Sequence, residues 1–144
     1  MVEFNIIIND SASDGYRKKA SQIDSKLKGL STRVVNVIHR WVQKEAPRKT
    51  GKLKSTIQKT SSAAGGSIFM GKGAPYFLYV LDGTRPHIIH FKNKGGLWWK
   101  GANHPMNHVH HPGTKANPYI DRGFEKSEAG IRTEVQKFVD WLES

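Results

Sequence analysis

A stripe of apolar residues recurs every three or four positions through residues 16–45 of this chain. That spacing places the stripe on one face of an α-helix, which would be about 45 Å long at 1.5 Å per residue. The stripe consists of Tyr16, Ala20, Ile23, Leu27, Leu30, Val34, Val37 and Trp41. We expect the helix to lie across a sheet or against a second long helix. The charges beside the stripe are mostly basic, which does not favour the paired charges of a coiled coil.

Pro47 ends this first helix, since proline has no amide hydrogen to donate. Two more segments have helical patterns. The apolar and aromatic run at residues 75–81 begins with a proline and is soon followed by Gly83, which predicts a short buried helix. A closing amphipathic helix is predicted from about Pro118. Its apolar face would carry Phe124, Ile131, Val135, Phe138 and Leu142.

Short apolar runs predict strands around these helices. The predicted strands cover residues 2–8, 55–59, 67–71, 87–91, 97–100 and 106–110. The second and third would pair as a hairpin with a long loop, and the fourth and fifth would pair across a tight turn at residues 93–96. The element order predicts an α+β fold, a mostly antiparallel sheet flanked by a long N-terminal helix and a C-terminal helix. A length of 144 residues favours one domain over residues 1–144.

Charge adds a candidate contact surface to this picture. The net charge is +11, and the first 60 residues carry 13 lysines and arginines against 5 acids. Arg48, Lys49, Lys52 and Lys54 lie on the turn that follows the first helix. Such cations attract DNA or an acidic protein neighbour, which makes these four residues our candidates for contact with DNA or with a ring partner. The alternative is a solvated, lysine-rich surface without a partner.

Composition and motifs exclude several classes of protein. The absence of cysteine excludes a disulfide framework and a thiolate metal site. No apolar run approaches the roughly 18 residues that cross a bilayer, and the N-terminus lacks the basic opening of a signal peptide. Synthesis in the cytoplasm without membrane contact is therefore expected. No phosphate-binding loop or glycine-flanked serine elbow is present, so we expect neither a cofactor nor a catalytic residue.

A cluster of histidines is the strongest argument for an enzyme. Six of the seven histidines lie between His87 and His111, and His108 and His110 would face the same side of a strand. However, no carboxylate occurs from residue 83 to residue 120, although hydrolytic metal sites usually use one. We therefore expect no metal site and favour a polar strand at a protein interface.

Trp98 and Trp99 are adjacent in the predicted strand at residues 97–100. Neighbouring side chains of a strand face opposite sides, so at least one tryptophan would belong to the core. The other would be exposed, and a large aromatic side chain on a surface is a typical interface anchor.

Three separated segments resemble, in order and spacing, the motifs of one known family. They read APRKTGKLKSTI at residues 46–57, APYFLYVLDGTRPHII at residues 74–89 and HPGTKANPYI at residues 111–120. From about residue 16 onward the chain is similar to the tail-completion (neck) protein family of long-tailed bacteriophages, named after gene product ten of the phage Hong Kong 97. Tyr119 stands where the family commonly has phenylalanine.

The resemblance implies a structural role without catalysis. Proteins of this family join the complex at the head's portal to the tail tube, as rings of six or twelve copies around the DNA path. The implied partners are other neck and tail proteins, such as the head–tail connector, tail terminator or tail tube, with non-specific contact to genomic DNA. The implied location is the virion, after assembly in the host cytoplasm. Gly51, Gly83 and Gly113 would serve turns of the fold.

Two other functions fit the residues taken alone. One is a small basic nucleic-acid-binding protein or histidine-metal nuclease, which the charge and the histidine cluster favour. The other is a lysine-rich adaptor that binds an acidic partner without catalysis.

Overall fold

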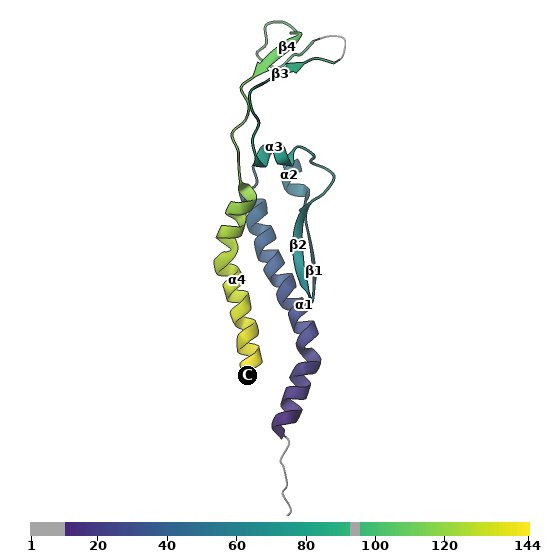
Figure 1. Cartoon of the computed structure of the whole chain (residues 1–144), viewed down its shortest axis with the longest axis vertical. Coiled ribbons are helices and arrows are strands. Elements are labelled where there is room, and N and C mark those ends of the chain that lie inside the picture. Colours follow the sequence, from purple (N-terminus) through teal and green to yellow (C-terminus); the bar gives the residue numbers. More distant parts are fainter. Residues whose placement is uncertain (1–10, 93–95) are drawn as a thin grey trace, which may run out of the picture.

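The computed structural model describes residues 11–92 and 96–144 of the chain. The elements are α1 (Ser11–Glu45), α2 (Lys52–Ser55), β1 (Ile57–Ser62), β2 (Gly65–Met70), α3 (Phe77–Leu81), β3 (His87–His90), β4 (His108–His111) and α4 (Tyr119–Glu143). Figure 1 shows an elongated molecule in which α1 and α4 lie side by side and the two strand pairs lie at different heights. The predicted α+β fold with two long helices is confirmed. The antiparallel strands form two separate two-stranded sheets, and the strand predicted over residues 2–8 lies outside the described residues.

Small residues bring α1 and α4 close together. A Cβ atom added at Gly123 would lie 2.7 Å from the Val42 Cα atom, and one added at Gly130 would lie 2.7 Å from a Val37 methyl group. Ser127, between the two glycines on α4, is fully buried. The backbone of α4 therefore rests almost directly on α1, and Phe124, Val135 and Leu142 of α4 remain exposed.

Two carboxylates on the facing helices each bind two cations. Glu45 accepts hydrogen bonds from Lys126 (2.7 Å) and Arg122 (3.3 Å), which fixes the end of α1 to the start of α4. Glu134 pairs in the same way with Lys137 and Arg33, both at 2.7 Å. The hydrogen bond from Lys126 lowers the pKa of Glu45, and the one from Lys137 lowers the pKa of Glu134.

These lowered pKa values predict a loss of stability in acid. Because the unfolded chain binds protons on Glu45 and Glu134 more readily than the folded chain, both ion-pair sets stabilise the fold above about pH 4.3, the ordinary pKa of glutamate. That stability is lost as the pH falls through the lowered pKa. Urea midpoints at pH 7 and pH 3.5 should therefore differ more for the wild type than for the double variant Glu45→Gln and Glu134→Gln. Glu128→Gln, which removes an exposed pair with Arg132, should retain the wild-type difference.

The β1–β2 hairpin packs along α1 and closes one end of the core. Its register runs from Ile57 opposite Met70 to Ser62 opposite Gly65, so only two residues connect the strands. The prediction of a long loop was wrong, because Gly65 adopts a φ of 140° that allows the tight reversal. The buried core lies at this end of α1 and consists of Val42, Ala46, Leu53, Ile57, Ala74 and Tyr119.

Two other predictions about local structure were wrong. The helix predicted at residues 75–81 exists as α3, but none of its residues is buried, and Leu78 and Tyr79 are exposed. Strand β3 pairs with β4 instead of with residues 97–100. Leu97 forms an isolated antiparallel bridge to Met106, and both of these residues lie between β3 and β4. Competing apolar segments of similar length leave strand pairing undetermined by local pattern.

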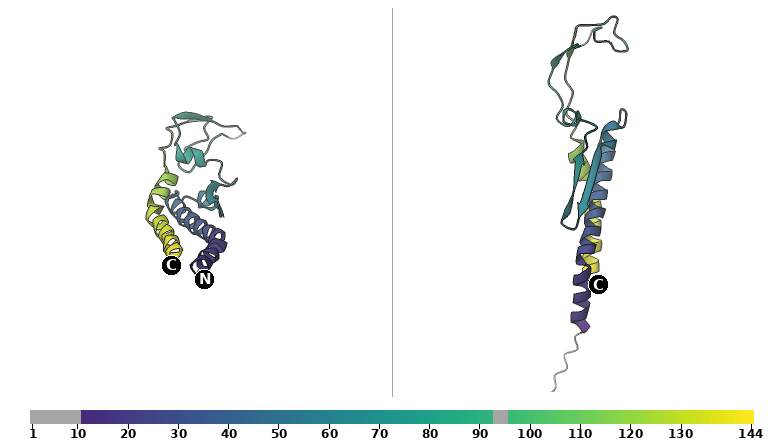
Figure 2. Two further views of the ribbon diagram at one scale, coloured as in Figure 1. Left: turned by 60° about the horizontal axis from the view of Figure 1, so that its bottom comes forward. Right: turned by 90° about the vertical axis from the view of Figure 1, so that its right-hand side faces the viewer.

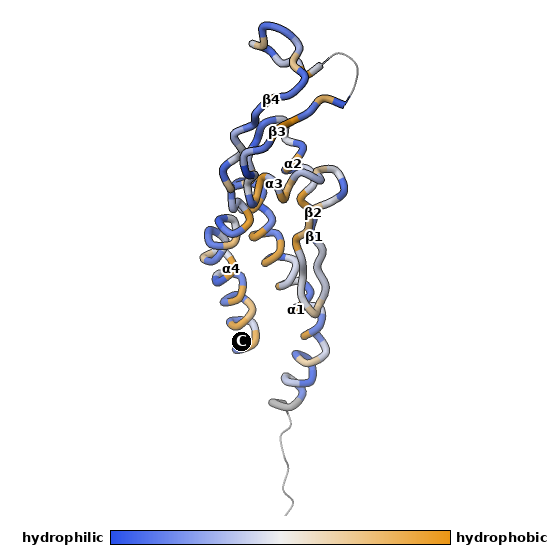
Figure 3. The backbone as a smooth tube through the Cα atoms, turned by 45° about the horizontal axis from the view of Figure 1, so that its top comes forward, coloured by the Kyte–Doolittle hydropathy of each residue, from blue (hydrophilic) through white to orange (hydrophobic). Residues whose placement is uncertain are grey.

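The strands β3 and β4, with the segment between them, project away from the helices. We call residues 85–112 the arm. Figure 2 shows the arm at one end of the molecule, while the β1–β2 hairpin lies against α1. The hydropathy colours of Figure 3 show apolar positions recurring along α4 down to its C-terminal turns. The molecule thus consists of a helix pair, a small core at one end of that pair and a protruding arm.

Candidate functional site

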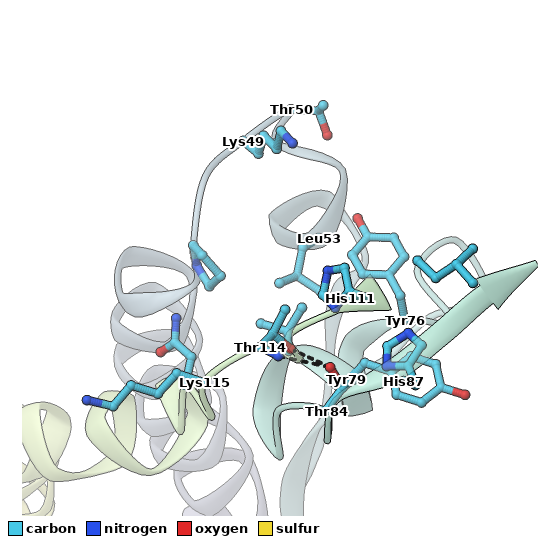
Figure 4. Close-up of a pocket in the computed structure, with 15 residues that line it drawn as sticks. Lys49, Thr50, Leu53, Tyr76, Tyr79, Thr84, His87, His111, Thr114 and Lys115 are labelled. Atoms are coloured by element: carbon cyan, nitrogen blue, oxygen red, sulfur yellow. Dashed lines mark hydrogen bonds between the residues drawn. The ribbon is translucent and has the colours of Figure 1, made fainter. Parts of the chain in front are cut away.

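A pocket of about 640 Å³ lies where the arm leaves the body of the molecule. Its lining comes from residues 47–53, from residues 76–89 and from residues 111–117. These ranges fall within the three segments that carry the family resemblance, although they lie far apart in the sequence. The structure therefore brings the three motifs together around one cavity (Figure 4).

Two glycine–threonine pairs hold the pocket together. Thr84 N–H donates to the Thr114 carbonyl oxygen at 3.0 Å, and Thr114 N–H donates to the Thr84 carbonyl oxygen at 3.1 Å. The two Oγ1 atoms lie 3.1 Å apart, as the dashed lines of Figure 4 indicate. We call Gly83-Thr84 and Gly113-Thr114 the Gly-Thr clasp. It joins the segment that enters the arm to the segment that leaves it.

The clasp requires glycine at both crossing points. Gly83 has a φ of 74° and Gly113 a φ of 86°, values that side chains rarely adopt. In addition, a Cβ atom at Gly83 would overlap the Thr114 carbonyl oxygen, and one at Gly113 would overlap the Thr84 carbonyl oxygen. Gly51 also has a positive φ, of 82°. The expectation that these three glycines serve turns is confirmed.

The segment after the clasp is tied to the core. The N–H of Asn117 donates to the carbonyl oxygens of Val80 and Leu81 at 3.0 and 3.1 Å, which caps the end of α3. Tyr119, two residues further on, is fully buried, and this burial raises the pKa of its phenol. Asn117, which lines the pocket, is therefore fixed to α3 by hydrogen bonds and lies two residues from the core residue Tyr119.

The lining of the pocket suits an apolar side chain next to a negative charge. Leu53, Tyr76 and Tyr79 supply apolar and aromatic surface, and Lys49 and Lys115 supply positive charge. Figure 4 shows the two tyrosines on one side and Lys49 on the loop above them. His87 and His111 also line the pocket, and the described lining residues include no carboxylate. The pocket thus combines apolar and aromatic surface with two cations.

The basic turn after α1 is exposed beside this pocket. Arg48, Lys49 and Lys52 are exposed and Lys54 is half-buried, and of these four only Lys49 lines the pocket. Leu53, between the last two, is buried in the core. Apolar residues of this segment thus build the fold, while its cations face outward.

Trp98 and Trp99 both lie in the arm and both are exposed. The expectation that one of them belongs to the core was wrong, because residues 97–100 do not form a strand whose faces alternate between core and solvent. Their role as interface anchors remains a prediction.

The histidines pair across the arm. His87 lies opposite His111 with ring centroids 5.0 Å apart, and the rings of His108 and His110 are 5.7 Å apart on the other face. The predicted same-side placement of His108 and His110 is confirmed. Within residues 11–92 and 96–144, no three or more histidine, aspartate or glutamate side chains are grouped to hold a metal ion.

Sequence reasoning missed the aromatic wall of the pocket. Tyr76 and Tyr79 belong to a run of apolar residues that looked like a core helix. Their spacing of three residues was the available signal, since it places both phenols on one helical face. The third lining segment also added Lys115, a cation remote in sequence from the basic turn.

No helix among the described residues is long and apolar enough to cross a membrane. Comparisons with protein-family models, with curated proteins and with solved structures find no match to this chain.

Proposed function

We propose that the chain is a structural protein of a phage or prophage that completes the tail and joins it to the head at the neck, as a ring around the DNA path. The observation that supports this proposal is the convergence of three segments on one pocket. Each segment alone resembles a neck-protein motif only weakly. A shared fold or docking site requires such segments to meet in space, and here they do.

The accessible surface supports an assembled state. The chain has a mass of 16.2 kDa and exposes 11438 Å², whereas a compact monomer of this mass exposes about 7,500 Å². The residues outside the described ranges could account for no more than about 2,000 Å² of the difference, even if fully extended. The remaining excess, about 2,000 Å², is the size of a stable protein interface.

In this role the pocket would receive a neighbour in the neck. Its aromatic wall and the cations Lys49 and Lys115 favour an acidic segment of a connector or tail protein. The exposed Arg48 and Lys52 lie beside it and would meet DNA or the same acidic neighbour. Catalysis has no part in this role.

Deletion of the gene tests the proposal directly. A phage that encodes this chain should produce filled heads and separate tails when the gene is removed, and negative-stain microscopy of lysates would show them. Supplying the gene from a plasmid should restore joined, infectious particles. Normal joined particles without the gene would refute the proposal.

The cations beside the pocket provide a finer test. Reversing charge with Lys49→Glu and Lys52→Glu should lower the restored titre at least tenfold, because an acidic partner or DNA would then be repelled. The fold should persist, since both side chains are exposed. Lys72→Glu, which reverses an exposed lysine outside this turn, should restore the titre like the wild type. A double variant that unfolds by circular dichroism would show that these lysines serve the fold instead.

A further inference from the structure

We infer that the outer apolar face of α4 docks on the N-terminal half of α1 in a second copy of this chain. The inference rests on the proposed function for its place in the virion, where this contact would join neighbouring subunits of the ring. The argument itself depends on which helix faces are covered and on their charge.

The apolar stripe of α4 is only partly covered, with Ile131 and Phe138 half-buried. Gly123, Ser127 and Gly130 make the contact with α1, and the predicted stripe lies beside them. As a result Phe124, Val135 and Leu142 remain 46%, 42% and 40% exposed. The face runs over about 27 Å of helix at 1.5 Å per residue. A continuous apolar face of this length is typical of a helix that packs against a further element.

The N-terminal half of α1 carries a second uncovered apolar face. Tyr16 and Ile23 are 75% and 38% exposed. Lys19 donates to the Leu142 carbonyl oxygen at 3.0 Å, so α4 ends beside residue 19, and Figure 1 shows α1 continuing past that end. The two uncovered faces therefore lie on different helices, and a rigid helix pair cannot fold one onto the other.

The two helical segments that carry these faces have opposite net charges. Helix α4 carries six acids and four lysines or arginines, a net charge of −2, in a chain whose net charge is +11. Residues 11–30 carry five lysines or arginines and two acids, a net charge of +3. Helix α4 of one copy is thus attracted to the N-terminal half of α1 in another, whereas two α4 helices or two such halves of α1 would repel.

The pairing of two different surfaces has a geometric consequence. A contact of this kind leaves one free α4 face and one free α1 face on every pair, so further copies can add until a ring closes.

Sedimentation velocity of the full-length chain tests the association first. We expect a weight-average mass above the monomer value of 16.2 kDa that rises with protein concentration and falls with added salt. A monomer at every concentration and salt would overturn the inference. That includes the case in which residues 2–8 of the same chain cover the α4 face.

Paired variants test which faces meet. Val135→Asp and Ile23→Asp each place a charge in one apolar face, and each alone should weaken association about 100-fold. Ala129→Asp and Gln22→Asp add the same charge at exposed positions off the two stripes and should associate like the wild type. Circular dichroism would establish that all four variants keep their helices.

Mixing the two defective variants provides the decisive measurement. Val135→Asp retains an intact α1 face and Ile23→Asp an intact α4 face, so an equimolar mixture should form dimers and nothing larger. A mixture that stays monomeric would overturn the pairing of α4 with α1. These solution results are independent of the particle experiment. Association as described, together with normal particles after gene deletion, would refute only the neck function. A monomer in solution, together with unjoined particles, would refute only this interface.

Discussion

Gly113→Ala is expected to destabilise the protein by at least about 2–3 kcal/mol, because alanine meets two separate penalties at this position. A positive φ costs a residue with a Cβ atom about 1–2 kcal/mol. The Cβ atom would also overlap the Thr84 carbonyl oxygen, so at least one hydrogen bond of the Gly-Thr clasp must break, at about 1 kcal/mol each. Urea unfolding measures the total. Hydrogen exchange at the Thr84 and Thr114 amides would show whether the clasp opens.

Two glycines of the same chain separate these penalties. Gly51 has a φ of 82°, and a Cβ atom there would meet nothing within 4 Å, so Gly51→Ala should cost only the backbone strain, about 1–2 kcal/mol. Gly15 lies in α1 with open space around it, and Gly15→Ala should stabilise the helix by about 0.5–1 kcal/mol. A Gly113→Ala variant no less stable than Gly51→Ala would show that the clasp tolerates a side chain.

Gly123→Leu is expected to separate α4 from α1. A Cβ atom at this position would lie 2.7 Å from Val42 Cα and 2.8 Å from Val42 N, and backbone atoms cannot rotate away as a side chain can. The N-terminal turns of α4 must therefore move outward and expose Tyr119, a fully buried aromatic residue. We expect a loss of about 3–5 kcal/mol, comparable to the removal of a large core side chain.

The matched control is Ala129→Leu, which adds a leucine to the exposed face of the same helix. It should change stability by no more than about 0.5 kcal/mol. Gly123→Ala should fall between the two leucine variants. Thermal unfolding followed by circular dichroism would rank all three. Equal stability of the two leucine variants would contradict a close backbone contact at Gly123.

The long helices were predictable because their signal is periodic and local. The apolar spacing in residues 16–45 and the stop at Pro47 placed the end of α1 at Glu45. The sequence did not reveal which face of each helix would be covered. The stripes looked like core faces, but Gly123 and Gly130 decided the contact by allowing the closest approach. Steric fit between two helices depends on both partners, so one helical pattern cannot determine it.

Strand pairing and the pocket required information from distant residues. Residues 97–100 and residues 106–110 both have a strand pattern, and the turn-type residues at 93–96 favour pairing of β3 with the nearer one. In the structure β3 pairs with β4, and an isolated bridge between Thr84 and Thr114 continues this pairing toward the body of the molecule. The apolar and aromatic pattern of α3 is typical of a core helix, but Leu78 and Tyr79 are exposed. Their exposure depends on the segments that surround α3, which the local pattern does not determine. Of the four candidate contact residues on the basic turn, only Lys49 lines the pocket, whereas Lys115, which also lines it, was not among the candidates.

The Gly-Thr clasp also makes the arm a separable module. The chain leaves the body at Thr84 and returns at Thr114, and the amides of these residues bond to each other's carbonyl oxygens. Two ends that already lie side by side can be joined by a loop of almost any length, since loop entropy grows only slowly with the number of residues. The segment between them can therefore lengthen, shorten or change its sequence without moving α3 or the start of α4. A change in the length or sequence of the arm can in this way change how far it extends and what it binds, while the fold of the body stays the same.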